Sequence, residues 1–313
     1  MLAIVAPGQG AQTPGFLAPW LAESRFAEKL AALAEASELD LAHFGTGADA
    51  DTIRDTAVAQ PLLVAAGIVT ALALDGTAAF TADTLVAGHS VGELTAAALS
   101  GVLSDTDAIV VVRERGRAMA EASAARPTSM TAIVGGEPED VLAAIDRAGL
   151  TPANNNGRGQ IVAAGTVEQL AALAEDAPRR ARLVPLSVAG AFHTVHMQPA
   201  VAHLQQVVAD VAVAEPVTRL VSNRDGALVA SGRDALERIV AQVANPVRWD
   251  LCMETMAGHG VTGLLELAPS GTLTGIAKRN LKGVELFSLN TPDQIDDARA
   301  FVAAHAGDNP AQA

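Results

Sequence analysis

The segment Leu85-Val86-Ala87-Gly88-His89-Ser90-Val91-Gly92 decides the fold of this chain, because it joins an apolar strand to a helix through a glycine-framed turn. We expect the strand over Thr84–Ala87 and the helix over Val91–Ser100. The turn has the pattern G-x-S-x-G, whose glycines relieve backbone crowding and whose serine projects at a helix N-terminus. The segment therefore predicts an α/β fold with Ser90 as a nucleophile. An ordinary glycine-rich turn that contains a serine is the alternative.

A serine hydroxyl is a weak nucleophile and needs a base. His193 is the best of the seven histidines, because the loop Gly190-Ala191-Phe192-His193 brings the chain back from an inserted segment. His89 lies inside the turn itself, and we expect its side chain to point away from that of Ser90. His193 and His196 have the spacing of a metal-binding pair, but no acidic third ligand is near in the sequence, so we predict no metal site.

One arginine occupies the apolar face of a predicted helix. The helix is expected over Asp105–Ser123, with Ser104 or Asp105 as its N-cap. Its stripe at helical spacing consists of Ala108, Val112, Arg115, Met119 and Ala122. A buried guanidinium needs an anionic partner, and its planar fork matches a carboxylate. Arg115 is thus a candidate to bind a substrate carboxylate, unless its side chain extends to the helix surface.

The middle of the chain has a different order of predicted strands and helices. Strands are predicted over Met130–Val134, Thr151–Asn154, Gln160–Ala164 and Ala181–Leu186, and helices over Pro138–Ala148 and Val167–Glu175. This order is the ferredoxin-like pattern. We interpret residues 127–188 as a small ferredoxin-like subdomain inserted into a large α/β domain that consists of residues 1–126 and 189–313. The small polar tail from Gly307 is expected to be frayed.

Composition excludes several classes of protein. The chain has 313 residues, and its 35 acidic against 21 basic residues give a net charge of −14, which argues against nucleic-acid binding over a global basic surface. Cys252 is the only cysteine, so an internal disulfide framework and multi-cysteine metal sites are excluded. Cys252 lies beside apolar residues in a predicted helix, and we interpret it as part of the core.

No targeting or membrane segment is predicted. Leu2–Ala6 lacks a preceding basic region and is interpreted as a first strand, not as a signal peptide. The longest apolar run, around Leu62–Leu74, is broken by Gly67 and is too short to span a bilayer. We therefore expect a cytoplasmic protein that does not contact a membrane.

Together these motifs resemble those of the malonyl-CoA:acyl carrier protein transacylase family, the acyltransferases of fatty acid and polyketide synthesis. The resemblance covers nearly the whole chain, from Pro7-Gly8-Gln9-Gly10-Ala11-Gln12 to Glu266-Leu267-Ala268-Pro269. It includes Gly88-His89-Ser90-Val91-Gly92-Glu93, Arg115-Gly116, Ala153-Asn154-Asn155-Asn156, Gly159-Gln160, Gly190-Ala191-Phe192-His193, Val221-Ser222-Asn223, Gln242-Val243 and Asn245-Pro246-Val247-Arg248-Trp249. The family implies a hydrolase-like large domain with a parallel sheet and a ferredoxin-like insert. Two departures are Thr194, where serine is commoner, and Ala268, where glycine is usual.

The resemblance also implies roles for single residues. Ser90 would be the acylated nucleophile and His193 its general base. The backbone N–H groups of Gln9 and Val91 would hold the oxyanion, and Arg115 would bind the free carboxylate of malonyl.

Two further positions follow from the same resemblance. The family orients its histidine through a backbone carbonyl instead of an aspartate, and the matching position is Gln242. In related synthase acyltransferases, an apolar residue after the nucleophile and a phenylalanine before the histidine accompany the choice of malonyl. Val91 and Phe192 fit that pattern, so malonyl is expected over methylmalonyl.

The implied reaction is a ping-pong transfer. Ser90 would take the malonyl group from malonyl-CoA, and the phosphopantetheine thiol of acyl carrier protein would then accept it. No bound cofactor or metal is implied, since the carrier supplies the phosphopantetheine, and the family suggests a monomer. The alternatives are a serine esterase or thioesterase that uses water as acceptor, and a catalytically silent module that binds the carrier.

The charge of −14 poses a question for this interpretation, because the CoA phosphates and carrier proteins are themselves typically acidic. Binding would have to use local basic clusters. The candidates are Arg113 with Arg117, Arg179-Arg180 with Arg182, and Lys278-Arg279 with Lys282. A solvated face is the alternative interpretation of each cluster.

Overall fold

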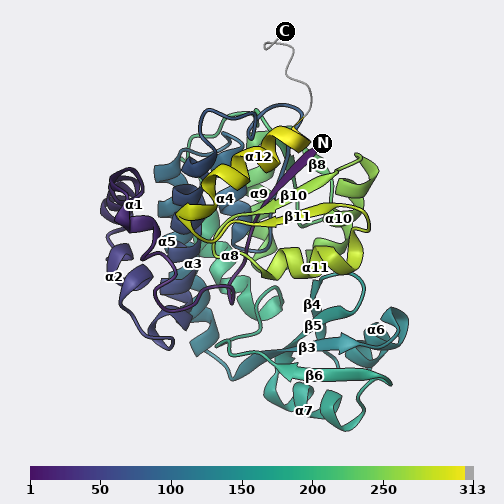
Figure 1. The fold of residues 1–313 in the computed structure, drawn as a ribbon. Coiled ribbons are helices and arrows are strands. Elements are labelled where there is room, and N and C mark those ends of the chain that lie inside the picture. The colour runs from purple at the N-terminus through teal and green to yellow at the C-terminus, as the bar shows by residue number, and fades with distance from the viewer. Residues whose placement is uncertain (307–313) are drawn as a thin grey trace.

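The computed structural model describes residues 1–306 as an α/β fold, in which the described strands form a larger and a smaller sheet (Figure 1). The tail predicted from Gly307 lies outside these residues. The strands are β1 (Leu2–Ala6), β2 (Leu85–Gly88), β3 (Thr128–Gly135), β4 (Thr151–Asn155), β5 (Gln160–Thr166), β6 (Ala181–Pro185), β7 (Arg219–Val221), β8 (Leu228–Val229), β9 (Val247–Arg248), β10 (Gly263–Glu266) and β11 (Glu285–Ser288). The helices are α1 (Ser24–Ser37), α2 (Leu41–Thr46), α3 (Thr56–Ala71), α4 (Gly92–Leu99), α5 (Asp105–Ala124), α6 (Pro138–Arg147), α7 (Val167–Glu175), α8 (Gln198–Val207), α9 (Gly232–Gln242), α10 (Trp249–Gly258), α11 (Thr272–Asn280) and α12 (Ile295–His305).

The larger sheet has the strand order β11-β10-β1-β2-β7-β8, and its strands run parallel except for β8 at the edge. Ala6 at the end of β1 lies beside Gly88 at the end of β2. The carboxyl ends of parallel strands meet at one edge of a sheet, which is where such folds place their sites. The loops that leave β1, β2 and β7 at this edge carry Gln9, Ser90 and Asn223.

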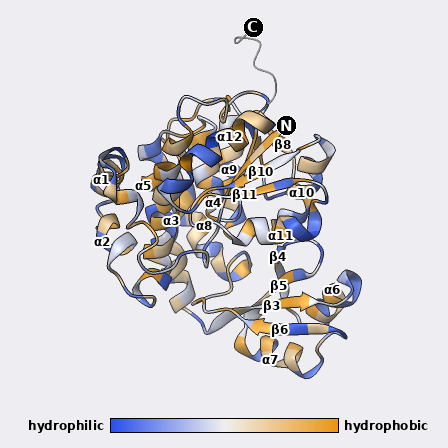
Figure 2. Ribbon diagram, viewed as in Figure 1, coloured by the Kyte–Doolittle hydropathy of each residue, from blue (hydrophilic) through white to orange (hydrophobic). Residues whose placement is uncertain are grey.

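Both faces of the larger sheet are buried, as continuous apolar strands predict. Leu2 and Ile4 of β1 belong to a core with helices α1, α3, α4 and α5. Ala3 and Val5 point to the other face, where α10 and α11 cover the sheet. Figure 2 shows the hydrophobic central strands enclosed by helices of mixed character. Strand β1 has the bounds predicted from the sequence, Leu2–Ala6, and all five of its residues are buried.

Helix α3 corrects one expectation. With the 3-10 turn that follows it, it forms a continuous stretch Thr56–Leu74 of 19 residues, which is long and apolar enough to cross a membrane. The expectation that this run is too short was wrong, because neither Pro61 nor Gly67 interrupts the helix. A Cβ at Gly67 would lie 2.5 Å from Cγ2 of Thr95, so glycine lets α4 pack closely. In the 18-residue apolar window of this stretch, 83% of the residues are buried inside the fold, and α3 is a core helix.

The smaller sheet has the strand order β6-β3-β5-β4-β9. Strands β3 to β6 pair antiparallel, and helices α6 and α7 lie between them in the predicted chain order. Strand β9 was not predicted. It belongs to the later part of the chain and pairs parallel with β4, where Asn154 lies beside Val247. The smaller sheet is thus joined to the larger part of the fold by backbone hydrogen bonds.

Helix α11 was also not predicted, and an acidic residue of the larger sheet holds its start. The carboxylate of Glu266, at the end of β10, accepts hydrogen bonds from the backbone N–H groups of Gly271, Leu273 and Thr274 at 2.8 to 2.9 Å. A carboxylate at a helix N-terminus satisfies unpaired donors and interacts favourably with the helix dipole. This contact places the first turn of α11 at the cavity described below.

Candidate active site

The turn between β2 and α4 is as crowded as its glycines predict. A Cβ at Gly88 would lie 1.9 Å from the carbonyl of Gly92, and one at Gly92 would lie 2.4 Å from the carbonyl oxygen of Ala6. Ser90 has a φ of +54°, in the left-handed region that non-glycine residues seldom adopt. This strained backbone directs the Ser90 side chain into the cavity.

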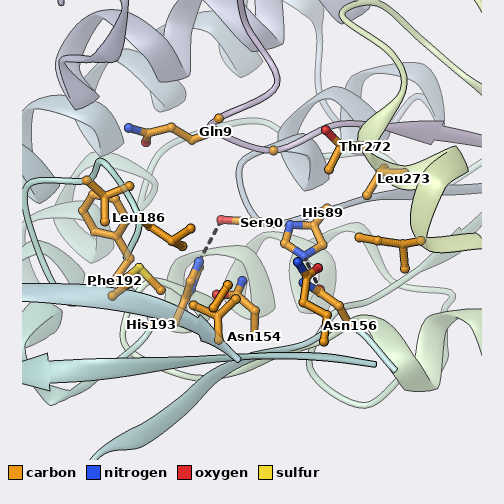
Figure 3. Close-up of a pocket in the computed structure, with 18 of the residues that line it drawn as sticks. Gln9, His89, Ser90, Asn154, Asn156, Leu186, Phe192, His193, Thr272 and Leu273 are labelled. Carbon is orange, nitrogen blue, oxygen red and sulfur yellow. Dashed lines mark hydrogen bonds between the residues drawn. The ribbon is translucent and has the colours of Figure 1, made fainter. Parts of the chain in front are cut away.

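Ser90 and His193 meet across 103 residues of sequence. Ser90 Oγ lies 2.8 Å from Nε2 of His193, as Figure 3 shows. Nδ1 of His193 lies 2.8 Å from the backbone carbonyl oxygen of Gln242, and this oxygen only accepts, so Nδ1 carries the proton. Nε2 is therefore free to accept the proton of Ser90. Burial, together with the positive charge of Arg115, lowers the pKa of His193 to about 3, which keeps the ring neutral.

Two backbone donors lie beside the serine. Gln9 follows β1 and Val91 follows Ser90, at the shared edge of the larger sheet. Among residues 1–306, no hydrogen-bond acceptor is paired with the backbone N–H of either residue. Free N–H groups beside a nucleophile can stabilise an oxyanion. The predicted pair is thus in a position suited to that role.

A cavity of about 240 Å³ opens over Ser90, between the edge of the larger sheet and one face of the smaller sheet (Figure 3). The smaller sheet contributes apolar and amide side chains, among them Met130, Ala132, Asn154 and Val162. Helix α11 adds Thr272, Leu273 and Ile276. Four predicted site residues line the cavity, namely Gln9, Ser90, Phe192 and His193. Three predicted site residues do not line it, namely Val91, Arg115 and Gln242.

Arg115 is only 1% exposed, so the alternative that it extends to the helix surface is wrong. Its Nη1 donates to Oε1 of Gln60 at 2.6 Å, and its Nη2 donates to Oε1 of Gln242 at 3.0 Å. Among residues 1–306, its buried Nε has no hydrogen-bond partner. Burial lowers the pKa of Arg115 to about 10, and the nearby Glu93 opposes this shift.

Glu93 is the buried acidic group nearest to Arg115 in this network, and the sequence interpretation missed it. Its carboxylate accepts hydrogen bonds from Nε2 of Gln242 at 2.5 Å and from the backbone N–H of Asn223 at 2.6 Å. Burial raises the pKa of Glu93 to about 8, although Asn223 and Arg115 favour its charged form. Gln242 thus bridges Arg115 and Glu93 with the two ends of one amide. The signal was available, because Glu93 is a charged residue in the otherwise uncharged helix α4.

Asn223 was also missed as a site residue. Its Oδ1 accepts a hydrogen bond from the backbone N–H of Ser90 at 2.8 Å, and its Nδ2 donates to the carbonyl of Gly88 at 2.8 Å. Asn223 therefore holds both sides of the strained turn. Cys252 lies against Asn223, is fully buried and has a raised thiol pKa because of that burial. Its interpretation as a core residue is confirmed.

His89, which lies next to Ser90 in the turn, has contacts of its own. Nε2 of His89 lies 2.9 Å from Oδ1 of Asn156, and its ring packs edge-on against Trp249. Figure 3 shows the His89 ring directed toward Asn156.

Within residues 1–306, no group of three or more His, Cys, Asp or Glu side chains is arranged to hold a metal ion.

The fold and the site define a class: α/β proteins in which a serine–histidine pair lies at the edge of a parallel sheet, an arrangement typical of enzymes that form acyl-serine esters. The profile of the acyl transferase domain family matches residues 4–304. The malonyl CoA-acyl carrier protein transacylase of Mycobacterium tuberculosis is 47% identical over 298 residues, which cover 95% of this chain and 99% of that protein. The Escherichia coli K12 enzyme of the same name is 33% identical, over 94% of this chain and 97% of that one.

Comparison with solved structures leads to the same group of enzymes. The crystal structure of the Mycobacterium tuberculosis enzyme matches with a TM-score of 0.91 at 46% identity, over 96% of this chain and 99% of that one. A malonyl-transacylase solved in complex with a type II polyketide acyl-carrier protein matches with a TM-score of 0.88 at 30% identity, over 96% and 99%. This chain belongs to the acyl transferase family, among its malonyl CoA-acyl carrier protein transacylases, and the resemblance inferred from the motifs is confirmed.

Proposed function

We propose that this protein transfers the malonyl group of malonyl-CoA to the phosphopantetheine thiol of an acyl carrier protein, through a malonyl ester on Ser90. One observation carries the proposal: the 2.8 Å contact between Ser90 Oγ and Nε2 of His193, in a cavity with the buried Arg115 behind its wall. The names of the relatives support the choice of both substrates, and the solved complex supports a carrier partner.

In the first half-reaction, Nε2 of His193 accepts the Ser90 proton while Oγ attacks the thioester carbonyl. The N–H groups of Gln9 and Val91 stabilise the oxyanion of the tetrahedral intermediate. The carbon–sulfur bond then breaks, and the CoA thiolate takes the proton from His193. In the second half-reaction, His193 deprotonates the phosphopantetheine thiol, whose sulfur attacks the ester. The proton then returns to the Oγ of Ser90.

The acyl group is selected by the charge of Arg115 and by steric crowding from Phe192. Arg115 binds the free carboxylate of malonyl, because its buried Nε has no partner within residues 1–306 and a carboxylate matches the geometry of the guanidinium. Phe192 lines the cavity next to His193 and crowds a substituent on the α-carbon, which favours malonyl over methylmalonyl.

The architecture fits this assignment. We infer a hydrolase-like large domain of residues 1–126 and 189–313 with an inserted ferredoxin-like subdomain of residues 127–188. The order β6-β3-β5-β4 and the antiparallel pairing support the second part. We further infer a cytoplasmic monomer without a resident cofactor or metal, which serves a carrier of fatty acid or polyketide synthesis.

The decisive experiment is the intact mass of the protein after exposure to malonyl-CoA, with the modified residue mapped. A malonyl adduct on Ser90 that is absent from Ser90→Ala supports the proposal, whereas an adduct on another residue refutes the nucleophile assignment. Addition of holo carrier protein tests the acceptor, since hydrolysis without malonyl-carrier product would indicate an esterase or thioesterase. A carrier-binding module without activity would release no burst of CoA.

A further inference from the structure

A glutamine separates Arg115 from the cavity. Gln60 lines the cavity and is 2% exposed, whereas Arg115 does not reach it. Oε1 of Gln60 accepts the hydrogen bond of Nη1 of Arg115 at 2.6 Å, a short contact for a charge-assisted bond. An amide oxygen thus occupies one of the positions that a carboxylate oxygen would take on this guanidinium.

The close approach of two helices brings Gln60 to Arg115. Gly116 of α5 faces α3, and a Cβ there would lie 2.9 Å from the carbonyl oxygen of Thr56 and 3.5 Å from Cδ of Pro61. Any larger residue would push the helices apart. Glycine next to Arg115 therefore allows the residue before Pro61, which is Gln60, to lie against the guanidinium.

The two glutamines on Arg115 are held with unequal strength. The amide nitrogen of Gln242 donates to Glu93 at 2.5 Å and also lies within hydrogen-bond distance of Asn223, so its orientation is fixed. Among residues 1–306, the amide nitrogen of Gln60 has one hydrogen-bond acceptor, the thioether sulfur of Met119 at 3.4 Å, and thioethers are weak acceptors. An incoming carboxylate therefore displaces Gln60 more readily than Gln242.

We propose that Gln60 is a specificity-determining residue, which occupies the carboxylate position on Arg115 in the free enzyme and is displaced by the carboxylate of malonyl. The proposal rests on the proposed function, in which Arg115 binds that carboxylate. A malonyl carboxylate exchanges a neutral acceptor for an anionic one on a buried guanidinium, which is favourable. A neutral acyl group such as acetyl offers no replacement, so Gln60 stays in place and covers the charge.

The test compares malonyl and acetyl loading of Ser90 in Gln60→Glu. The introduced carboxylate stays on Arg115 and competes with malonyl, so the ratio of malonyl to acetyl loading should fall by about 100-fold. Gln160→Glu is the matched control, because Gln160 also lines the cavity but bonds to Asn156 instead of Arg115. Its ratio should fall by about tenfold or less, since it adds the same charge without occupying the guanidinium.

Gln60→Met is the second variant, and it keeps the test decisive if Gln60→Glu does not fold. Without the amide, Nη1 of Arg115 lacks its acceptor in the free enzyme, and only malonyl restores one. The ratio of malonyl to acetyl loading should therefore rise, by about tenfold. Equal ratios in Gln60→Glu and Gln160→Glu, or a fall in Gln60→Met, would overturn the inference. Wild-type protein that takes no malonyl on Ser90 would instead refute the proposed function.

Discussion

The backbone carbonyl of Gln242 accepts a hydrogen bond from Nδ1 of His193 at 2.8 Å, so a neutral group orients the general base. A carboxylate in this place would stabilise the imidazolium form that arises during the reaction. The buried acidic residue is Glu93, and it contacts the side-chain amide of Gln242 instead of His193. The oxygen of that amide accepts a hydrogen bond from Arg115. Gln242 therefore links the base to the residue that we propose as the carboxylate binder.

Arg115→Ala should reduce malonyl loading much more than acetyl loading. Only malonyl carries a carboxylate for the guanidinium, and loss of such a charge-assisted pair is expected to cost about 100-fold in kcat/KM. Acetyl loading should change by less than about tenfold, apart from any loss of folded protein. Burst release of CoA from each thioester measures both rates. Equal losses for the two substrates would contradict this role of Arg115.

The pH dependence of acetyl loading should reveal the environment of His193. Burial and then the Arg115 charge lower its pKa to about 3, so the base stays neutral below its ordinary range. The wild-type rate should therefore show no acid limb near the ordinary pKa of histidine, about 6.5. In Arg115→Ala the positive neighbour is gone, the pKa of His193 rises, and an acid limb should appear at higher pH than in the wild type. Identical pH profiles would exclude this electrostatic coupling.

The elements around the serine were predictable because each has a strong local signal. Strand β1 is a continuous apolar run, and Gly88 and Gly92 permit contacts that no Cβ could make. Strand β9 has only two residues, and β11 is a half-buried edge strand. Neither therefore has a periodic hydrophobic pattern that distinguishes it from a loop. Tertiary pairing determines such elements, and local sequence does not.

The partners in the site were harder to predict than its central residues. Arg115 was recognised as a charge on an apolar face, and the same argument applied to Glu93 would have pointed to the acidic group near it. Gln60 and Asn223 gave no such signal, since a single amide is unremarkable until the fold shows what it contacts. Their importance depends on the geometry between helices and loops that are distant in sequence.

Glu93→Gln should change how stability depends on pH. Burial raises the pKa of Glu93 from 4.5 to about 8, so the native state binds the proton more tightly than the unfolded state. This group therefore destabilises the wild type progressively as pH rises from about 4.5 to 8, and glutamine removes that effect. The unfolding free energy of Glu93→Gln relative to wild type should increase by roughly 2 to 3 kcal/mol between pH 6 and pH 9. Urea unfolding at both pH values measures it, and a constant difference would contradict the buried titration.

Phe192→Ala should relax selection against a substituted α-carbon. Phe192 is 6% exposed and lines the cavity, so its removal opens space next to His193. The ratio of methylmalonyl to malonyl loading should rise by about tenfold, the scale of discrimination that one methyl group provides. Leu273→Ala is the control, because it removes volume from the α11 side of the cavity, across Ser90 from Phe192 (Figure 3). A similar rise in both variants would show that cavity volume alone decides the selection.

The basic clusters differ in whether their side chains form ion pairs. Arg113 forms ion pairs with Glu38 and Glu114, and Arg117 also pairs with Glu114. The cluster at the end of α11, which consists of Lys278, Arg279 and Lys282, forms no ion pair within residues 1–306. The first turn of the same helix lines the cavity. An acidic carrier that delivers its thiol to Ser90 is therefore expected to contact this cluster.

Replacement of all three α11 cluster residues by glutamate should raise the KM for carrier protein by about tenfold at low salt, because rim charges act mainly on association. The difference from wild type should shrink as salt is added. Arg117→Glu is the control, and it should leave this KM within about twofold, since Arg117 already contacts Glu114 and does not line the cavity. Steady-state transfer at two ionic strengths measures all three proteins. An unchanged KM in the triple variant at low salt would exclude the end of α11 as the carrier contact.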